Sequence, residues 1–276
     1  MITLLRNLRH GPLNFLSPLW VALGSVFRWA IAGLNLTTSQ HIGAYGPFRL
    51  DGRFAFSNFK RWGEGHNDSF AACVEACRGR RVVLDIGAHI GLVSLPVASI
   101  LVDDGLLVAF EPATANAALL DRHIYLNNLS QKVRIENTLV GEEDRDDVPF
   151  FELCDATGMN TVVPYAMGGD YRPVSRSQIT LDTYCSDHDL TPEVIKIDVE
   201  GAELGVLRGG RETLSRCRPT IFLSVHPRQI ALLGEAVDAL FDLIESLDYV
   251  CRHADGTAVT EFRLREYVLT PRQEHP

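Results

Sequence analysis

An acid and two glycines stand close together in the stretch RVVLDIGAHIGLVSLPVA, where Asp85 lies near the end of an apolar run and Gly87 and Gly91 follow it. Gly87 can adopt a positive φ and lets a ligand approach the backbone, whereas Gly91 lets the next helix start close against the strand. The spacing is G-x-x-x-G, so the dinucleotide fingerprint G-x-G-x-x-G is incomplete. The stretch predicts a turn that holds a nucleotide-like cofactor.

Two acidic residues narrow the choice of cofactor. Glu111 lies 20 residues after Gly91, where a carboxylate accepts the two hydroxyls of an adenosine ribose. NAD and S-adenosylmethionine both carry this ribose. Asp85 separates them, because a carboxylate at the tip of the first strand repels a pyrophosphate and favours an ammonium and a sulfonium. Taken singly, Asp85 could cap a helix and Glu111 could be a surface charge. Together they predict S-adenosylmethionine.

The elements that must position these residues alternate between apolar strands and helical stretches. This alternation is typical of an α/β fold, with an open, mostly parallel sheet covered by helices on both faces. We expect strands at residues 82–86, 106–110, 133–137, 194–198 and 220–225, and helices at about 91–100, 113–127, 201–216 and 234–246. Before the fourth strand we expect a solvated turn at residues 141–148 and short antiparallel strands within 150–184.

The first 78 residues lack this alternation of strands and helices. Residues 1–44 are expected to form an apolar helical extension, in which Arg28 argues against a transmembrane helix because a charge at the bilayer centre is costly. We prefer a helix that packs on the domain or on a second subunit to a membrane-surface helix or a signal peptide, so a homodimer is a reasonable expectation. Residues 45–78 are expected to form a lead-in hairpin (45–59) and a helix, which act as a lid.

Composition and charge limit the partners. The 276 residues carry a formal net charge of −9, which leaves no basic stripe for phosphates and excludes a nucleic-acid partner. The six cysteines contain no CxxC pair, so we expect buried reduced thiols rather than a zinc site or disulfides. The expected partner is a small molecule and the expected compartment is the cytoplasm.

Five stretches resemble, in this order and spacing, the FkbM-type S-adenosylmethionine-dependent methyltransferases. They are VVLDIGAHIGLVS, VAFEPATANAALLDRHIYLNN, ITLDTY, VIKIDVEGAELGVLRGG and FLSVHP. The likeness covers roughly residues 64–267, and the combination of FEP with IKIDVEGAE is specific. It implies a Rossmann-like class I methyltransferase fold of about seven strands, here expected at residues 79–276. It also implies methylation of a hydroxyl on a sugar or a secondary metabolite.

The chemistry is expected where the fourth and fifth strands end. Methyl transfer is an in-line displacement, so the protein must hold the acceptor oxygen and help to remove its proton. Asp198 and Glu200 in KIDVEGAE suit either a general base or a divalent ion, and no metal is predicted. His226 is the first candidate for the base, because an ordinary histidine pKa near 6.5 suits neutral pH. It could instead fix the turn before Pro227.

Further roles follow from topology and from the resemblance. Lys196 shares a strand face with Asp198 and is expected to form a buried ion pair with a nearby acid. Members of the resembled family commonly carry a glutamate where this chain has Ser224, and this departure argues against a carboxylate-assisted or metal-assisted mechanism. The predicted cofactor-binding residues are Glu64, Asp85, Gly87, Ala88, His89, Gly91, Glu111, Asn116, Leu139 and Asp198.

The leading interpretation is an S-adenosylmethionine-dependent O-methyltransferase that acts on a hydroxyl of a small molecule, a sugar or a secondary metabolite. An NAD-dependent oxidoreductase on the same fold shares Glu111, but it lacks the third glycine and meets Asp85. A non-catalytic partner-binding domain is a third alternative, for which Ser224 is the one hint.

Overall fold

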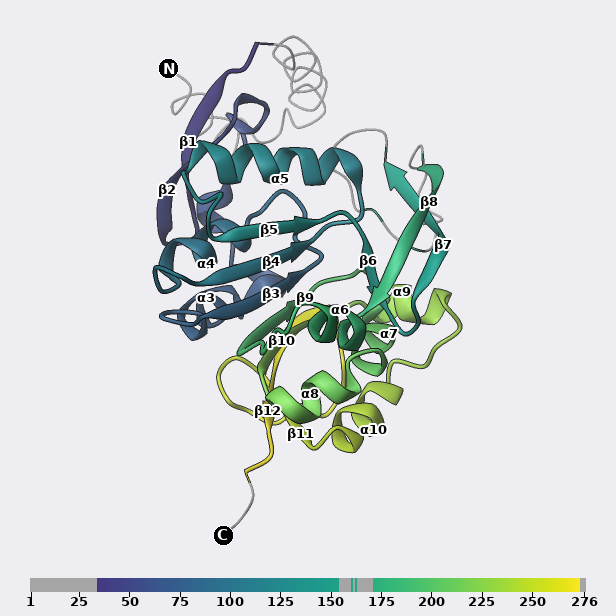
Figure 1. Ribbon diagram of the computed structural model, residues 1–276. Coiled ribbons are helices and arrows are strands. Elements are labelled where there is room, and N and C mark those ends of the chain that lie inside the picture. The colour runs from purple at the N-terminus through teal and green to yellow at the C-terminus, as the bar shows by residue number, and fades with distance from the viewer. Residues whose placement is uncertain (1–33, 154–159, 161, 163–170, 274–276) are drawn as a thin grey trace, which may run out of the picture.

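A seven-stranded sheet forms the centre of the molecule in a computed structural model that describes residues 34–153, 160, 162 and 171–273 (Figure 1). The strand order is β11-β12-β10-β9-β3-β4-β5, and β12 runs antiparallel to both of its neighbours. The strands are β3 (Val82–Ile86), β4 (Leu106–Phe110), β5 (Val133–Glu136), β9 (Val194–Ile197), β10 (Thr220–Val225), β11 (Tyr249–Arg252) and β12 (Arg265–Pro271). The prediction of an α/β fold with about seven mostly parallel strands is confirmed.

Helices cover both faces of this sheet. Side chains alternate along each strand, so Val83 packs into a core with α3, α4 and α5, whereas Leu84 packs into a core with α6 to α10. The helices on the first face are α3 (Phe70–Ala76), α4 (Ser94–Ile100) and α5 (Thr114–Leu126). Those on the second are α6 (Leu181–Asp187), α7 (Glu203–Arg208), α8 (Arg211–Cys217), α9 (Pro227–Leu232) and α10 (Ala239–Ser246).

Two helical stretches differ from the prediction. The helix expected at 201–216 is divided into α7 and α8 at Gly209, where a Cβ atom would lie 2.0 Å from the carbonyl oxygen of Gly141. This close backbone approach needs a glycine, and it interrupts the helix. The helix expected from residue 234 starts only at Ala239, and the short α9 precedes it. Six residues are too few to show a helical period in the sequence.

The lead-in hairpin lies earlier in the chain than expected. Strands β1 (Thr37–Ile42) and β2 (Tyr45–Asp51) pair antiparallel around Gly43, which has φ +56°. Residues 37–42 are therefore a strand, and the prediction of a helical extension over 1–44 is wrong for them. The alternating pattern of β2 was visible, but its partner precedes it. Residues 1–33, where the apolar helix was expected, lie outside the described residues.

Short helical turns and α3 follow the hairpin. The 3-10 helices are η2 (Gly52–Phe54), η3 (Phe59–Arg61) and η4 (Gly65–Asn67). The helix predicted after the hairpin within residues 45–78 is confirmed as α3, and Ser69 occupies its N-cap position. The part of the chain that the structure describes holds no helix with the length and apolar character that a membrane span requires.

A second, three-stranded sheet stands beside the main sheet (Figure 1). It consists of β6 (Leu139–Gly141), β7 (Arg145–Leu153) and β8 (Tyr171–Thr180), in the order β6-β8-β7. The expected antiparallel pair before β9 is thus present, but β7 begins inside the stretch 141–148 that was predicted as a solvated turn. Pairing with β8 explains the difference, because it gives these polar residues backbone partners that local sequence does not reveal.

The connection of the strands determines where a ligand can enter. From β3 the chain continues through β4 to β5 on one side, whereas β9 and β10 lie on the other side of β3. The strand order therefore reverses between β3 and β9. In open α/β sheets, ligands bind outside the carboxyl ends of the strands at this position.

Candidate active site

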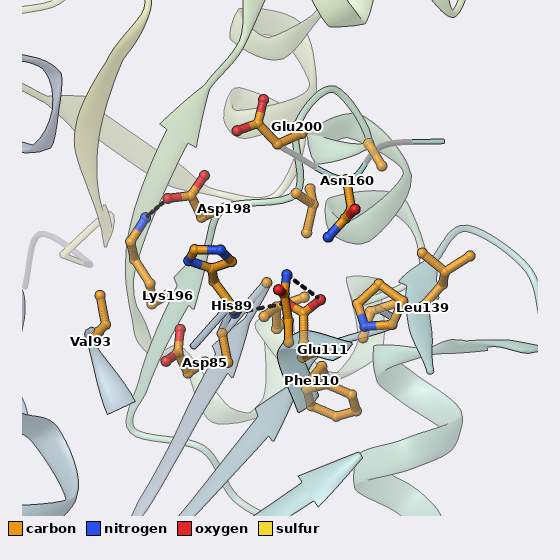
Figure 2. Close-up of a pocket in the computed structure, with 18 of the residues that line it drawn as sticks. Asp85, His89, Val93, Phe110, Glu111, Leu139, Asn160, Lys196, Asp198 and Glu200 are labelled. Atoms are coloured by element: carbon orange, nitrogen blue, oxygen red, sulfur yellow. Dashed lines mark hydrogen bonds and ion pairs between the residues drawn. The ribbon is translucent and has the colours of Figure 1, made fainter. Parts of the chain in front are cut away.

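A cavity of about 280 Å³ opens at the carboxyl ends of β3, β4 and β9 (Figure 2). The predicted site residues that line it are Asp85, Gly87, Ala88, His89, Glu111, Asn116, Leu139, Asp198, Glu200 and His226. Its other walls come from the lead-in segment, from the three-stranded sheet and from two residues between β7 and β8. They include Trp62, His66, Asn67, Phe150, Asn160, Val162 and Gln178. The fold therefore brings together residues from most of the chain.

Two predicted cofactor-binding residues do not line the cavity. Glu64 forms an ion pair with Arg61, with 2.6 Å between the charged atoms, and its side chain is 57% exposed. Gly91 precedes α4 by three residues, and a Cβ atom there would come 2.7 Å from a methyl group of Leu120 on α5. Gly91 thus leaves room for Leu120 of α5, whereas the side chain of Glu64 is exposed to solvent.

Gly87 joins the ends of two strands. It has φ +88°, and a Cβ atom there would lie 1.8 Å from the carbonyl oxygen of Asp198. The backbone N–H of Asp198 donates a hydrogen bond of 2.8 Å to the carbonyl oxygen of Ile86, the residue before Gly87. The space that glycine leaves is therefore filled by the protein backbone. This packing holds the loops after β3 and β9 in contact, so Asp85 and Asp198 belong to one site.

Glu111 is a buried carboxylate whose position is set by backbone amides. Its two oxygens accept hydrogen bonds from His89 N at 2.7 Å and from Ala113 N at 2.9 Å. Burial raises the pKa of Glu111 to about 7, although these amides and Asn116 lower it. Each carboxylate oxygen has lone pairs for further donors. The side chain is thus held in a position to accept hydrogen bonds from hydroxyl groups.

Asn116 and Asp85 lie near this carboxylate with different partners. Asn116 Nδ2 is 3.4 Å from Glu111, whereas the buried Asn116 Oδ1 has no hydrogen-bond partner among the described residues. Asp85 accepts a hydrogen bond of 2.5 Å from Ser94 Oγ on α4. Burial raises the pKa of Asp85 to about 6, against the effect of this hydrogen bond. Both residues line the cavity, and each has an oxygen that can accept a further hydrogen bond from a ligand.

His226 stands among three carboxylates. Its Nδ1 atom is 2.7 Å from Glu203 Oε1, and its Nε2 atom is 3.6 Å from both Asp198 Oδ1 and Glu200 Oε1. Burial lowers the pKa of the ring, but the hydrogen bond with Glu203 and the three negative charges outweigh burial and raise the pKa to about 9. At neutral pH the ring of the ligand-free protein therefore carries a proton, unlike the ordinary histidine that the sequence suggested.

Glu203 is the contact to His226 that sequence reasoning did not assign. It lies in the first turn of α7 with no exposed surface, and it also accepts from Gly201 N at 3.1 Å. The motif KIDVEGAE places Glu203 three residues after Glu200, but the burial of Glu203 beside β10 depends on the tertiary packing.

Asp198, Glu200 and His226 are residues of the described chain that could hold a metal ion, since one ligand atom from each lies within 4.8 Å of the others.

Lys196 forms the buried ion pair that was predicted. Its Nζ atom is 2.9 Å from Glu266 Oε1, 3.3 Å from Asp198 Oδ2 and 2.6 Å from Ser224 Oγ. Burial lowers the pKa of Lys196, but the two acids outweigh burial and raise it above its usual range. Figure 2 shows Lys196 joined to Asp198 at the cavity wall.

Glu266 was missed because it comes from the last strand of the sheet. In the pairing of β10 with β12, Glu266 lies directly opposite Ser224. The carboxylate absent at position 224 is thus supplied from the adjacent strand. No local signal marks Glu266, since only the antiparallel register brings it to Lys196.

Comparison with solved structures gives low similarity over much of the chain. The methyltransferase FkbM from Methylobacillus flagellatus KT is 20% identical, with a TM-score of 0.45, over 70% of this chain and 44% of that one. The precorrin-6y C5,15-methyltransferase from Geobacter metallireducens GS-15 is 12% identical, with a TM-score of 0.43, over 75% and 89%. The O-methyltransferase from Bacillus cereus in complex with SAH is 14% identical, with a TM-score of 0.41, over 72% and 76%.

The chain thus aligns with less than half the length of the Methylobacillus flagellatus protein. A comparison with curated proteins gives no match. The family model described as the methyltransferase FkbM domain matches residues 85–251, which is more than half of the chain. This range contains the glycine turn, Glu111 and the group around His226. The chain therefore belongs to the FkbM methyltransferase domain family.

Proposed function

We propose that the protein is an S-adenosylmethionine-dependent O-methyltransferase that acts on a hydroxyl of a small molecule, a sugar or a secondary metabolite. The proposal depends on one observation: a single cavity is lined by two sets of residues. Glu111 is a carboxylate placed to bind the ribose hydroxyls, and Asp198, Glu200 and His226 form a group that can bind a proton. The family supplies the reaction class, and the cavity supplies a place for both reactants.

Two observations support S-adenosylmethionine as the cofactor. Four carboxylates line the cavity, namely Asp85, Glu111, Asp198 and Glu200, whereas Lys196 is the lining lysine and no arginine lines it among the described residues. This balance favours a cationic ligand over a pyrophosphate. The buried Asn116 Oδ1 without a partner is a second feature that a ligand donor would satisfy.

Different residues of the cavity are expected to contact different parts of the cofactor. Glu111 is expected to accept the ribose hydroxyls, with Asn116 beside it, and Leu139 is expected to contact the adenine. Asp85 and Asp198 lie on the side of the cavity where the ammonium and sulfonium groups are expected. When bound, S-adenosylmethionine supplies a methyl group on a positively charged sulfur.

The group around His226 is proposed to handle the acceptor proton. His226 binds a proton more strongly than an ordinary histidine, and Glu203 holds its ring by hydrogen bonding to Nδ1. Its Nε2 atom therefore faces Asp198 and Glu200 on the cavity side. In its deprotonated form, whose share grows as the pH rises towards the pKa of about 9, this fixed ring positions a base relative to an acceptor oxygen better than a freely rotating one.

The remaining walls favour a neutral acceptor. Apolar residues such as Trp62 and Phe150 line the cavity beside the amides of Asn67, Asn160 and Gln178. Amides bind hydroxyl groups without requiring a charge. We propose a small hydroxylated molecule rather than a nucleic acid as the acceptor.

Two further expectations remain proposals. A homodimer through the apolar N-terminal residues concerns residues 1–33, which lie outside the described part of the chain. A cytoplasmic location is supported by free thiols, since the described cysteines form no disulfide and Cys73, Cys77 and Cys185 are buried.

Calorimetry with S-adenosylmethionine and with NAD tests the cofactor. We expect the full chain to bind S-adenosylmethionine and to bind NAD weakly or not at all. Preferential binding of NAD would overturn the proposal in favour of an oxidoreductase. Mass spectrometry of hydroxylated acceptors, incubated with the protein and S-adenosylmethionine, tests the reaction by the gain of one methyl group. A protein that binds the cofactor and methylates nothing supports the non-catalytic alternative.

A further inference from the structure

Three atoms in the cavity converge on one point. Asp198, Glu200 and His226 each offer one ligand atom, and these atoms lie within 4.8 Å of one another. The nitrogen is 3.6 Å from each of the two oxygens, which is longer than a hydrogen bond. A protonated ring that only neutralised these carboxylates would close on one of them at about 2.8 Å. The observed spacing leaves a gap between all three atoms.

The second oxygen of each carboxylate is held from outside this group. Asp198 Oδ2 lies 3.3 Å from Lys196 Nζ, and Glu200 Oε2 accepts a hydrogen bond of 2.9 Å from Gln229 Nε2 on α9. The turn that carries Glu200 is packed against the same helix, since a Cβ atom on Gly201 would lie 2.6 Å from Gln229. These contacts aim the remaining oxygen of each carboxylate at the gap.

His226 is held in the same way. Its side chain is 6% exposed, Nδ1 is hydrogen-bonded to Glu203, and Nε2 faces Asp198 and Glu200 at 3.6 Å. The Nε2 atom thus lines the cavity beside two carboxylates, at distances that leave room for a cation between the three groups. Histidines that bind metals typically hold their other ring nitrogen against a carboxylate in this manner.

The spacing also fits one cation. Ligand atoms at about 2.1 Å from an octahedral cation lie about 3.0 to 4.2 Å from one another. Small movements of the side chains bring the three atoms into this range. Two carboxylate oxygens and one imidazole nitrogen suit Mn²⁺, whose other positions are filled by oxygens of water or of a hydroxyl.

We propose that Asp198, Glu200 and His226 bind a divalent cation of the Mn²⁺ type, with Lys196, Gln229 and Glu203 as the residues that orient them. The sequence left a divalent ion possible at Asp198 and Glu200 but did not predict one. Only the role of the cation rests on the proposed function. There the cation would take the place of the proton on His226 Nε2, which is released to water, and His226 would act as a ligand and not as the base. The cation would hold the acceptor oxygen beside the cofactor and stabilise its negative charge, and the acceptor proton would leave to water.

Direct metal binding tests this inference without any activity measurement. The full chain is stripped with a chelator, dialysed and titrated with MnCl₂ by calorimetry and electron paramagnetic resonance. We expect one saturable site and, in pulsed spectra, a nitrogen coupling from His226. The absence of a saturable site at Mn²⁺ concentrations up to about 1 mM, which is the weak end of protein sites for hard cations, would overturn the proposal.

Variants locate the site. Glu200→Gln keeps the size of the side chain and is expected to weaken Mn²⁺ binding at least tenfold, and His226→Gln is expected to remove the nitrogen coupling. Gln229→Leu is expected to weaken binding by about 10-fold to 100-fold, although Gln229 touches no ion, because it orients Glu200. Asp146→Asn is the matched control, since Asp146 borders a separate acidic hollow and should leave binding unchanged.

Two measurements keep the result interpretable. Circular dichroism and thermal unfolding show whether each variant is folded, and retained Mn²⁺ binding in folded Glu200→Gln and His226→Gln proteins would overturn the proposal. Calorimetry with S-adenosylmethionine on the same samples separates the two proposals. Cofactor binding without Mn²⁺ binding contradicts the metal site alone, whereas Mn²⁺ binding without cofactor binding contradicts the proposed function alone.

Discussion

Lys196 on β9 and Glu266 on β12 form an ion pair of 2.9 Å inside the protein, and their side chains are only 3% and 4% exposed. Neither charge reaches water, so each depends on the other for its stability. Asp198 shares the lysine at 3.3 Å, which couples this pair to the cavity. The antiparallel last strand is thus part of the site's support.

Replacement of Lys196 by Met should destabilise the protein strongly. It leaves Glu266 buried and unpaired, and the loss of one partner of a buried pair costs about 3–5 kcal/mol. Urea unfolding measures the change, and Glu266→Gln in the same chain should restore part of it. Arg263→Met, which removes an exposed ion pair with Glu261, is the control and should change little. Equal effects of the two replacements would contradict the assignment.

Glu111→Gln should weaken the binding of S-adenosylmethionine about tenfold or more. The amide keeps the shape of the side chain but loses charge-assisted hydrogen bonds to the ribose, each worth about 1.5–3 kcal/mol. Calorimetry checks this change. Glu136→Gln, at the end of the neighbouring strand β5 and outside the cavity, should bind like the original protein. Unchanged binding by Glu111→Gln would remove Glu111 from the cofactor site.

The same carboxylate should make cofactor binding depend on pH. Glu111 has a pKa of about 7 in the ligand-free protein, and only its ionised form accepts both ribose hydroxyls. Affinity should therefore rise about tenfold between pH 6 and pH 8, as the proton that competes with binding is lost. Calorimetry across this range should show the rise in the original protein and a smaller one in Glu111→Gln. Parallel profiles for the two proteins would contradict the prediction.

His123 should lower the stability of the protein in mild acid. It is fully buried between Asp51 N and the carbonyl of Ile90, and burial lowers its pKa to about 4. The unfolded chain binds a proton near pH 6.5 while the folded one does not, so stability is complete above that pH and falls as pH decreases towards 4. The loss at pH 5 should be about 2 kcal/mol.

Urea unfolding at pH 8 and pH 5 measures this effect. His123→Gln, which cannot take up the proton, should be less stable at pH 8 and should lose less stability between the two pH values. Comparison of the two proteins isolates His123 from the acids that titrate in the same range. An identical loss in both would show that His123 does not cause it.

Gly87→Ala should be far more damaging than Gly79→Ala. Both glycines have a positive φ, but a Cβ atom at Gly87 meets the backbone of Asp198 at 1.8 Å, whereas Gly79 has open space around it. The control should lose about 1–2 kcal/mol for the left-handed backbone. Gly87→Ala must in addition separate β3 from β9, so it should unfold at much lower temperature or fail to accumulate. Similar melting temperatures for the two variants would contradict the close approach.

Local pattern was sufficient for the centre of the fold. The parallel strands β3, β4 and β10 have the predicted bounds, because a buried strand between helices is a continuous apolar run that needs no knowledge of its neighbours. The pattern failed where a partner strand decides the structure. The strand β1 was expected as helix, and β7 was expected in part as a turn, since each is stabilised by backbone pairing with another segment.

The candidate site divides in the same way. The sequence by itself determined which chemical groups are present and at which strand ends they lie, including Glu111 after β4 and the motif of Asp198 and Glu200 after β9. These follow from short spacings along the chain. Tertiary structure decided their states and partners. Glu266 reaches Lys196 through strand register, Glu203 reaches His226 through helix packing, and the resulting burial and charge move the pKa of His226 to about 9. Burial and electrostatic contact depend on residues distant in sequence, so no local pattern contains them.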